Sequence, residues 1–163
     1  MASDPPIRYS AARGVLGLVA FGAAVAAAAL LGALAVGNAR QDYAALEQPS
    51  WAPPAAVFGP VWTVLYAMIA VSGWLVWRVV GLHRALIPYA VQLALNALWT
   101  PLFFGAGAYG VAAVEIVVLW VAIGATVVAF WRVHRGAALL LLPYWLWVTF
   151  ATALNISIWW LNR

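Results

Sequence analysis

Two amide side chains and two aromatic rings share one face of a long apolar segment in the middle of the chain. They are Gln92, Asn96, Trp99 and Phe103, spaced four, three and four residues apart, which places them on one helical stripe. An amide inside a membrane loses its water and needs another partner, so the stripe is expected to face a neighbouring helix or a cavity. This face is therefore the first candidate for a binding site.

The opposite face of the same segment carries small residues and a proline. They are Ala90, Ala94, Ala97 and Pro101, each two residues before a member of the first stripe, a rotation of about 200° around a helix. Small side chains let helices approach closely in a membrane. The face suits either a homodimer contact or packing within one bundle, and the sequence leaves both alternatives open.

Two further segments place aromatic, polar and small residues along one face. One stripe consists of Phe58, Trp62 and Tyr66, and the other of Tyr144, Trp147, Ala151 and Asn155. Antiparallel helices bring these stripes to the depth of Asn96. Rings supply stacking area, amides supply orientation and a small residue leaves space, so the group suits a flat, mostly apolar ligand with polar edges. The alternative is plain packing, with Asn96 and Asn155 bonding across helices.

The composition is that of an integral membrane protein. Hydrophobic residues make up 67% of the 163 residues and charged residues 7%, with a mean hydropathy of +0.99, and a soluble surface needs far more charge. Runs of about 20 apolar residues predict membrane-spanning helices, whereas the alternation of a membrane β-barrel is missing. The sequence therefore predicts an all-α bundle of five transmembrane helices in a single domain, 1–163, with spans at 14–37, 58–80, 85–104, 109–131 and 137–159.

Arginine placement predicts the orientation of the chain. Six arginines lie in the N-terminal segment, the 78–84 loop and the 132–136 loop, whereas Arg40 and Arg163 lie on the other side. Cytoplasmic loops are enriched in basic residues, so in a cytoplasmic (inner) membrane the N-terminus is expected inside. The pattern does not choose between that membrane and an outer membrane of bacteria or mitochondria. Since orientation explains the net charge of +4, no nucleic-acid partner is expected.

The first connection is the longest. It covers about 20 residues, 38–57, and contains Tyr43, Trp51 and three prolines, whereas the other connections are short. Long loops in compact proteins are commonly functional or disordered, and aromatic rings with rigid prolines disfavour disorder. We expect this loop to form a structured cap over the outer half of the bundle.

Some aromatic and acidic residues have simpler interpretations. Five tryptophans near span ends are expected in the interfacial belt: Trp74, Trp77, Trp131, Trp159 and Trp160. Glu115 is the only acid within a span, where an unpaired charge costs a few kcal/mol. Reaching the outer interface, or pairing with Arg40 or Arg163, would relieve that cost.

Metal and cofactor chemistry has no support in the sequence. The chain has no cysteine, so it has neither a disulfide nor a thiolate ligand. His83 and His134 lie in loops, whereas a haem bound by iron ligation in the membrane needs histidines within the spans. Phosphate loops, zinc motifs and nucleophile elbows are also missing. We expect no metal and no resident cofactor.

Four ordered segments resemble the signature of the TspO/translocator protein family, also known as tryptophan-rich sensory proteins or peripheral benzodiazepine receptors. They are Tyr43-Ala44, the loop motif QPSWAPP at 48–54 continued by FGPVWTVLY at 58–66, the segment 92–105 from Gln92 through Phe-Phe-Gly, and the segment 143–155 from Pro-Tyr to Leu-Asn. The resemblance extends over nearly the whole chain from the first span onward.

The resemblance implies a five-helix membrane receptor, often a homodimer, that binds porphyrins and ligands of the benzodiazepine-receptor class under the first loop. Some bacterial members promote light-dependent porphyrin breakdown, and Trp62 and Trp147 match the tryptophans implicated there. Porphyrin would be a ligand rather than a cofactor. Together with the stripes above, the candidate ligand-binding residues are Tyr43, Trp51, Trp62, Tyr66, Gln92, Asn96, Trp99, Trp147, Ala151 and Asn155.

The chain also departs from the family pattern. Ile156 stands where relatives of the mammalian receptor have the tyrosine of a cholesterol motif, which argues against cholesterol recognition of that kind. Ala106 and Gly107 replace a basic residue that many members have after Phe-Phe-Gly. Two alternatives to a receptor or sensor stay open: a transporter of tetrapyrroles or other amphipathic molecules, and a light-dependent porphyrin-degrading enzyme.

Overall fold

The structure, a computed structural model, describes residues 10–34 and 39–163, and within these two ranges it contains helices and no strand. The elements are α1 (Ala11–Leu34), α2 (Ala39–Ala45), a 3-10 turn η1 (Ala55–Val57), α3 (Phe58–Val80), α4 (Leu86–Thr100), a π-helical turn η2 (Pro101–Gly105), α5 (Tyr109–Trp131) and α6 (Arg135–Leu161). Five of these segments are long and apolar enough to cross a membrane. The predicted all-α, five-helix membrane fold is confirmed.

Helix bounds differ from the predicted spans where local chemistry extends or interrupts a helix. Helices α3 and α5 cover the residues predicted for the second and fourth spans, whereas α1 starts at Ala11, and its predicted end at residue 37 lies outside the described residues. After α4, the amide of Ala106 bonds to the carbonyl of Pro101, five residues back, and this widens the turn. Helix α6 starts early because the His134 ring accepts the Ala137 N–H.

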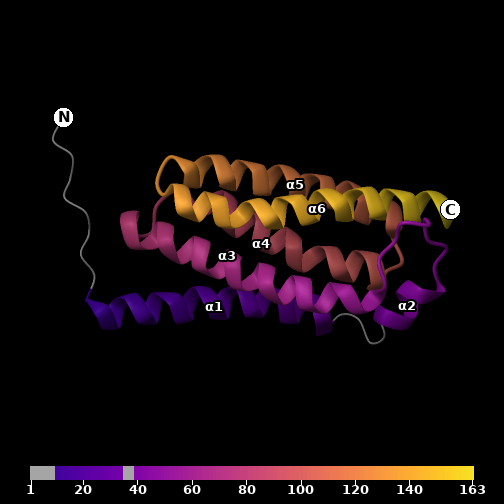
Figure 1. The fold of residues 1–163 in the computed structure, drawn as a ribbon, viewed down its shortest axis with the longest axis horizontal. Coiled ribbons are helices and arrows are strands. Elements are labelled where there is room, and N and C mark those ends of the chain that lie inside the picture. Colours follow the sequence, from indigo (N-terminus) through magenta and orange to yellow (C-terminus); the bar gives the residue numbers. More distant parts are fainter. Residues whose placement is uncertain (1–9, 35–38) are drawn as a thin grey trace.

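The five long helices form a closed ring. Helix α1 contacts α3 and α4, α3 contacts α6, α6 contacts α5, and α5 contacts α4, whereas α3 and α4 touch little. The short helix α2 and the C-terminus lie at one end of the bundle, and α1 begins at the other (Figure 1). Residues 39–57, which comprise α2 and η1, lie at the first of these ends, and we call them the cap. We refer to the two ends as the cap end and the far end.

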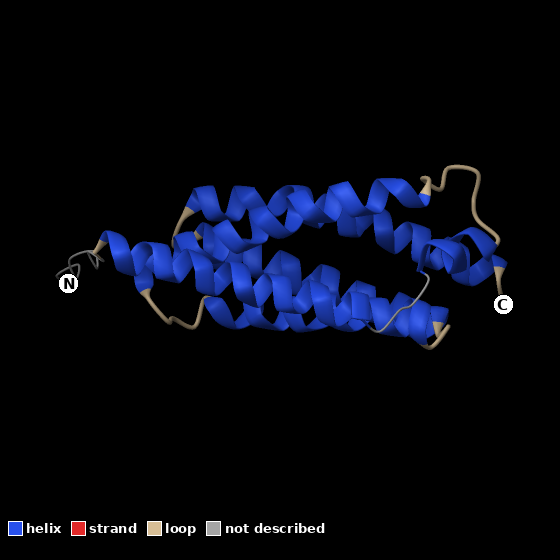
Figure 2. Cartoon of the chain, turned by 90° about the horizontal axis from the view of Figure 1, so that it is seen from below, coloured by secondary structure: helices blue, strands red, loops and turns tan. Residues whose placement is uncertain are grey.

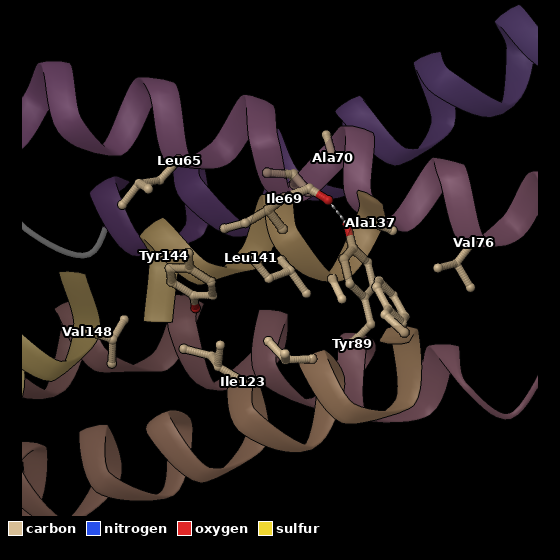
Figure 3. Close-up of a cluster of buried hydrophobic side chains, with 14 of the residues drawn as sticks. Leu65, Ile69, Ala70, Val76, Tyr89, Ile123, Ala137, Leu141, Tyr144 and Val148 are labelled. Atoms are coloured by element: carbon tan, nitrogen blue, oxygen red, sulfur yellow. Dashed lines mark hydrogen bonds between the residues drawn. The ribbon is translucent and has the colours of Figure 1, made fainter. Parts of the chain in front are cut away.

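The far half of the bundle is tightly packed. Side chains of α3, α5 and α6 meet there in one buried cluster, which includes Ile69, Ile123, Leu141 and Tyr144 (Figure 3). The Tyr89 hydroxyl donates to the carbonyl of Ile69 at 3.0 Å, and both residues are buried. The buried side chains of this half therefore form a packed core next to the cap half.

Small side chains let α3 and α6 approach closely in this half. Ala137 and Ala138 are completely buried, and the Ser72 hydroxyl donates to the Ala137 carbonyl at 2.7 Å. Such a bond needs the two helix backbones to lie close together, which a larger side chain at either alanine would prevent.

Two tryptophans expected in the interfacial belt hold α1 instead. The Trp74 indole N–H donates to the carbonyl of Gly14 at 2.8 Å. The Trp77 ring packs so closely over Gly17 that a Cβ added there would overlap the ring. The belt interpretation of these two residues is therefore incomplete, because at the far end of α3 both rings are used to attach α1.

The cap is folded and joined to α6. The Tyr43 hydroxyl donates to the carbonyl of Pro53 at 3.1 Å, and the Gln48 amide donates to the Tyr43 carbonyl. Burial raises the pKa of the Tyr43 phenol, which keeps it neutral. At the end of α6, Asn162 accepts the Glu47 N–H at 3.0 Å and donates to the Glu47 carbonyl at 2.9 Å. These bonds hold the cap against the bundle.

The small-residue face of α4 is divided between two environments. Ala90 and Ala94 are exposed on the single chain, whereas the carbonyl of Ala97 lies close to Gly32 of α1. The cap-end part of this face, at Ala97, therefore packs within the bundle. A homodimer contact through Ala90 and Ala94 stays a prediction.

Candidate ligand-binding cavity

A cavity of about 700 Å³ lies inside the cap half of the bundle, and we call it the main cavity. This volume falls within the roughly 300–1,000 Å³ typical of small-molecule sites. All five long helices and α2 contribute to its wall, which is lined by Ala29, Ala33, Ala39, Gln41, Phe58, Gly59, Trp62, Tyr66, Asn96, Trp99, Thr100, Ile116, Leu119, Trp147, Val148 and Ala151.

Aromatic rings form much of the wall. Trp62 stacks on Tyr66 with ring centroids 5.1 Å apart, and its edge contacts Tyr144 at 6.1 Å. Across the cavity, Trp147 meets Phe58 in an edge contact at 5.8 Å. The four-residue spacing of Phe58, Trp62 and Tyr66 places all three rings on the inward face of α3. Flat aromatic faces separated by open space favour a planar apolar ligand.

Asn96 connects three helices at the floor of the cavity. Its carbonyl oxygen accepts the Tyr66 hydroxyl at 3.0 Å, and its amide nitrogen donates to the Tyr144 hydroxyl at 3.1 Å. The amide therefore bonds across helices, as the packing alternative expected, and it also lines the cavity. Because both partners fix its orientation, Asn96 presents a defined polar point in a mostly apolar wall.

A second hollow of about 240 Å³, the side cavity, adjoins the main cavity and shares Phe58, Trp62, Trp99 and Ala151 with it. Trp99 and Asn155 both line it. The Trp99 indole N–H donates to the Asn155 carbonyl oxygen at 2.9 Å, and the Asn155 amide donates to the carbonyl of Tyr109 at 3.1 Å. The side-chain amides of Asn96 on α4 and Asn155 on α6 thus hold the aromatic walls in place.

Three buried polar side chains have no hydrogen-bond partner within the described part of the chain. They are Gln92, Glu115 and, at its indole nitrogen, Trp147. The expected pairing of Glu115 with Arg163 is wrong, because both carboxylate oxygens are buried and the Arg163 guanidinium lies over the Trp160 ring. The side chain of Arg40 lies outside the part of the chain that the structure describes. Trp147 differs from Trp99 in that no hydrogen bond fixes its ring.

Eight of the ten predicted ligand-binding residues line the two cavities: Tyr43, Trp62, Tyr66, Asn96, Trp99, Trp147, Ala151 and Asn155. The other two lie elsewhere. Trp51 is 48% exposed on the cap and packs against Phe150 with ring centroids 5.7 Å apart. Gln92 is only 1% exposed but lies one turn below Asn96, outside both linings. Whether these ten residues bind a ligand stays a prediction.

Several residues of the cavity wall could not be recognised from the sequence pattern. Ile116 and Leu119 come from α5, a helix that is apolar on all sides and therefore has no distinguishable face. Ala29 and Ala33 lie in an alanine-rich segment that suggested helix packing. A search for small residues at helical spacing opposite the aromatic stripe could have identified this pair.

The described residues that line the two cavities are uncharged. None of the described residues lining either hollow is an acid, a lysine, an arginine or a histidine. Across the described ranges, no group of three or more His, Asp or Glu side chains is close enough to hold a metal ion. The arrangement can stack, exclude water and hydrogen-bond a neutral or weakly polar molecule.

The fold and the cavity define the class: an integral membrane protein, a five-helix bundle with an aromatic interior cavity under a cap. Comparison with known proteins is more specific. Residues 20–161 match the TspO/MBR family, so the chain belongs to this family. It is 43% identical to the human translocator protein over 128 residues, 76% of each chain. It is 41% identical to protein CrtK of Rhodobacter capsulatus over 127 residues, covering 74% of this chain and 78% of the relative.

The similarity also extends to an archaeal relative. The tryptophan-rich protein TspO of Archaeoglobus fulgidus is 38% identical over 151 residues, which cover 91% of this chain and 98% of that protein. Membership supports a role as a membrane sensor or receptor. The resemblance stated from the sequence motifs is thereby confirmed.

Proposed function

We propose that the protein is a membrane receptor or sensor that binds a porphyrin, or a synthetic ligand of the benzodiazepine-receptor class, in the main cavity. The observation that carries the proposal is the uncharged aromatic hollow, in which Trp62, Trp99 and Trp147 stand on three different helices. A planar macrocycle is the ligand shape that uses several ring faces at once.

The polar residues of the cavity define an orientation for such a ligand. Asn96 lies at the floor, whereas Gln41 and Thr100 lie near the cap. Polar ring substituents would lie toward Gln41 and Thr100, where water is nearer, and the apolar ring edge would lie deeper. Trp147 can turn toward the ligand without breaking a hydrogen bond, since its indole N–H has no partner.

A dark titration with protoporphyrin IX tests the proposal, with the shift of the porphyrin absorbance band as the readout. Ala151→Phe is the main variant, because Ala151 lines both hollows and a phenyl ring there fills their space. We expect saturable binding to the parent and an affinity at least about tenfold lower in the variant, equivalent to about 1.4 kcal/mol.

The matched control is Ala153→Phe. This alanine lies two residues further along α6, is exposed and lines neither hollow. It should bind as the parent does. Equal affinities in Ala151→Phe and the parent would place the site elsewhere, and a parent that leaves the absorbance band unchanged would remove porphyrin as the ligand.

The positions of Trp62 and Trp147 favour a second candidate function, light-dependent porphyrin breakdown. Both rings line the main cavity, and Trp62 stacks on Tyr66. A tryptophan against a photoexcited porphyrin can donate an electron to it, and breakdown of the ring then requires dioxygen as the oxidant, which accepts the electrons removed from the porphyrin. Illumination of the bound complex should then bleach the porphyrin in the parent and more slowly in Trp62→Phe and Trp147→Phe. Equal bleaching in variants that still bind would exclude this role for the two tryptophans.

A further inference from the structure

Helix α1 changes its neighbour along its length. At the far end it is attached to α3, through the bond from Trp74 to Gly14 and the packing of Trp77 on Gly17. At the cap end it lies against α4, where a Cβ on Gly32 would meet the Thr100 hydroxyl at 3.4 Å. Helix α1 therefore crosses the bundle diagonally, and it separates from α3 toward the cap end (Figure 2).

The main cavity lies where the two helices separate. Helices α1 and α3 are antiparallel and rise equally per residue, so the contacts at the far end place Ala29 at the depth of Trp62. The same register places Ala33 at the depth of Gly59. All four residues line the main cavity. At this depth, the main cavity therefore occupies the place where α1 and α3 would otherwise be in direct contact.

The residues at this gap are small, and its sides reach the surface. Ala33 and Gly59 are exposed, Ala29 is half-buried, and a Cβ built on Gly59 meets no atom within 4 Å. Both helices are long and apolar enough to cross a membrane. The space beside Gly59 therefore opens on the outer surface of the bundle, between two helices that can cross a membrane.

Access from water is obstructed at the same end of the molecule. Two hydrogen bonds join Glu47 of the cap to Asn162 of α6, and Trp51 packs on Phe150. The Tyr43 ring also meets Phe58 in an edge contact at 5.3 Å. A ligand arriving through the cap must break these contacts, whereas one arriving between α1 and α3 passes the small residues Ala29, Ala33 and Gly59 before it reaches Trp62.

We propose that the gap between the cap-end halves of α1 and α3 is a lateral portal, through which an amphipathic ligand dissolved in the membrane reaches the main cavity. The proposal rests on the proposed function and adds the source of the ligand, the bilayer leaflet at the cap end. It fits the chemistry of the route, because a flat apolar ring partitions into lipid and meets no charged side chain among the residues named here.

Binding kinetics in proteoliposomes test the portal, with protoporphyrin IX added to the membrane in the dark. Gly59→Leu narrows the gap from the α3 side and Ala33→Leu narrows it from the α1 side. An obstructed route slows passage in both directions, so the association and dissociation rate constants should fall together, by about tenfold, within the range seen among variants of one site. A variant that only loses contact with the ligand would instead dissociate faster.

Gly22→Leu is the matched control. Gly22 is also a helical glycine with no atom within 4 Å of an added Cβ, and it lines neither hollow. It should leave both rate constants at the parent values. Faster dissociation in Gly59→Leu and Ala33→Leu, or rate constants equal to those of the parent, would overturn the portal.

A second measurement needs no porphyrin. Trp62 stands behind the gap, so its fluorescence should be quenched in vesicles of phosphatidylcholine brominated midway along the acyl chain. The Trp62 signal is the difference between the parent and Trp62→Phe. We expect it to lose at least half as much intensity as Trp120, a partly lipid-exposed tryptophan on α5 measured in the same way with Trp120→Phe.

The two measurements separate the portal from the proposed function. Quenching of Trp62 without porphyrin binding would remove the function and leave a portal open to lipid. Porphyrin binding with an unquenched Trp62 would overturn the portal and leave the function.

Discussion

The two halves of the bundle contain the same kinds of side chain but differ in how tightly these side chains are packed. In the far half, Tyr89 stacks on Phe130 with ring centroids 5.7 Å apart, and neighbouring side chains fill the remaining space. In the cap half, Trp62 of α3 and Trp147 of α6 line a hollow of about 700 Å³. The rings of the far half are surrounded by packed side chains, whereas those of the cap half border open space together with small residues such as Ala29, Ala33 and Gly59.

The comparison teaches that a cavity needs support as well as space. An apolar hollow tends to collapse, because its lining atoms lack contact partners on one side. Here the bonds from Tyr66 to Asn96 and from Trp99 to Asn155 hold the walls apart. The far half needs no such bonds between its rings, since packing fixes them.

The largest predicted difference concerns two leucines of equal burial. Leu141 is 1% exposed in the packed half, and Leu119 is 2% exposed but lines the main cavity. Leu141→Ala should cost about 2 kcal/mol or more, near the lower end of the usual range because helix packing in lipid lacks the water-transfer contribution. Leu119→Ala should cost less, since the space that its side chain vacates joins the main cavity instead of forming a new one. Unfolding in detergent mixtures measures both, and equal costs would contradict the division into two halves.

Two glycines of α3 give the next comparison. A Cβ on Gly73 would lie 2.6 Å from the Tyr89 ring and 2.7 Å from Phe21, whereas one on Gly59 meets nothing within 4 Å. Gly73→Ala should therefore destabilise by about 1–3 kcal/mol through overpacking. Gly59→Ala should be neutral or slightly stabilising, because alanine is the better helix former. Thermal unfolding of the two variants measures both changes in stability. An unchanged stability of Gly73→Ala would mean that the side chains around Gly73 can move to make room for a methyl group.

Two tyrosines offer a finer comparison. The Tyr89 and Tyr66 hydroxyls each donate a hydrogen bond of 3.0 Å, to a backbone carbonyl in the packed half and to Asn96 at the cavity. Tyr89→Phe should cost about 1 kcal/mol. Tyr66→Phe should cost less, since a cavity of this size has room for a water beside Asn96, which can replace the lost donor. The free energies of unfolding of the two variants test this comparison. A larger loss for Tyr66→Phe would show that no water replaces the lost donor and that the cavity is dry.

The fold could be predicted from the sequence because each span is a long apolar run, and the ends of α3 and α5 coincide with changes in polarity. The aromatic side of the cavity was also predictable, since Phe58, Trp62 and Tyr66 repeat every four residues. The crossing of α1 was not, because it depends on Gly17 and Gly32 meeting different helices. Neither contact changes the composition or periodicity of α1, so the helical spacing of Ala29 and Ala33 reveals a small-residue face but not the cavity that it lines.

The smallest predicted effect belongs to Gln92, which tests whether every polar group on the Asn96 stripe supports the cavity. Gln92 lies one turn from Asn96, yet neither its oxygen nor its nitrogen has a partner within the described residues. Gln92→Leu should therefore change stability by no more than about 0.5 kcal/mol or increase it, because replacing a buried unpaired amide removes a desolvation penalty. Asn155→Leu is the matched control, and it should be clearly destabilising since Asn155 holds both Trp99 and the Tyr109 carbonyl. A strongly destabilised Gln92→Leu would instead reveal a water or ligand bound to the amide, and the polar floor of the cavity would then extend one turn deeper toward the packed half.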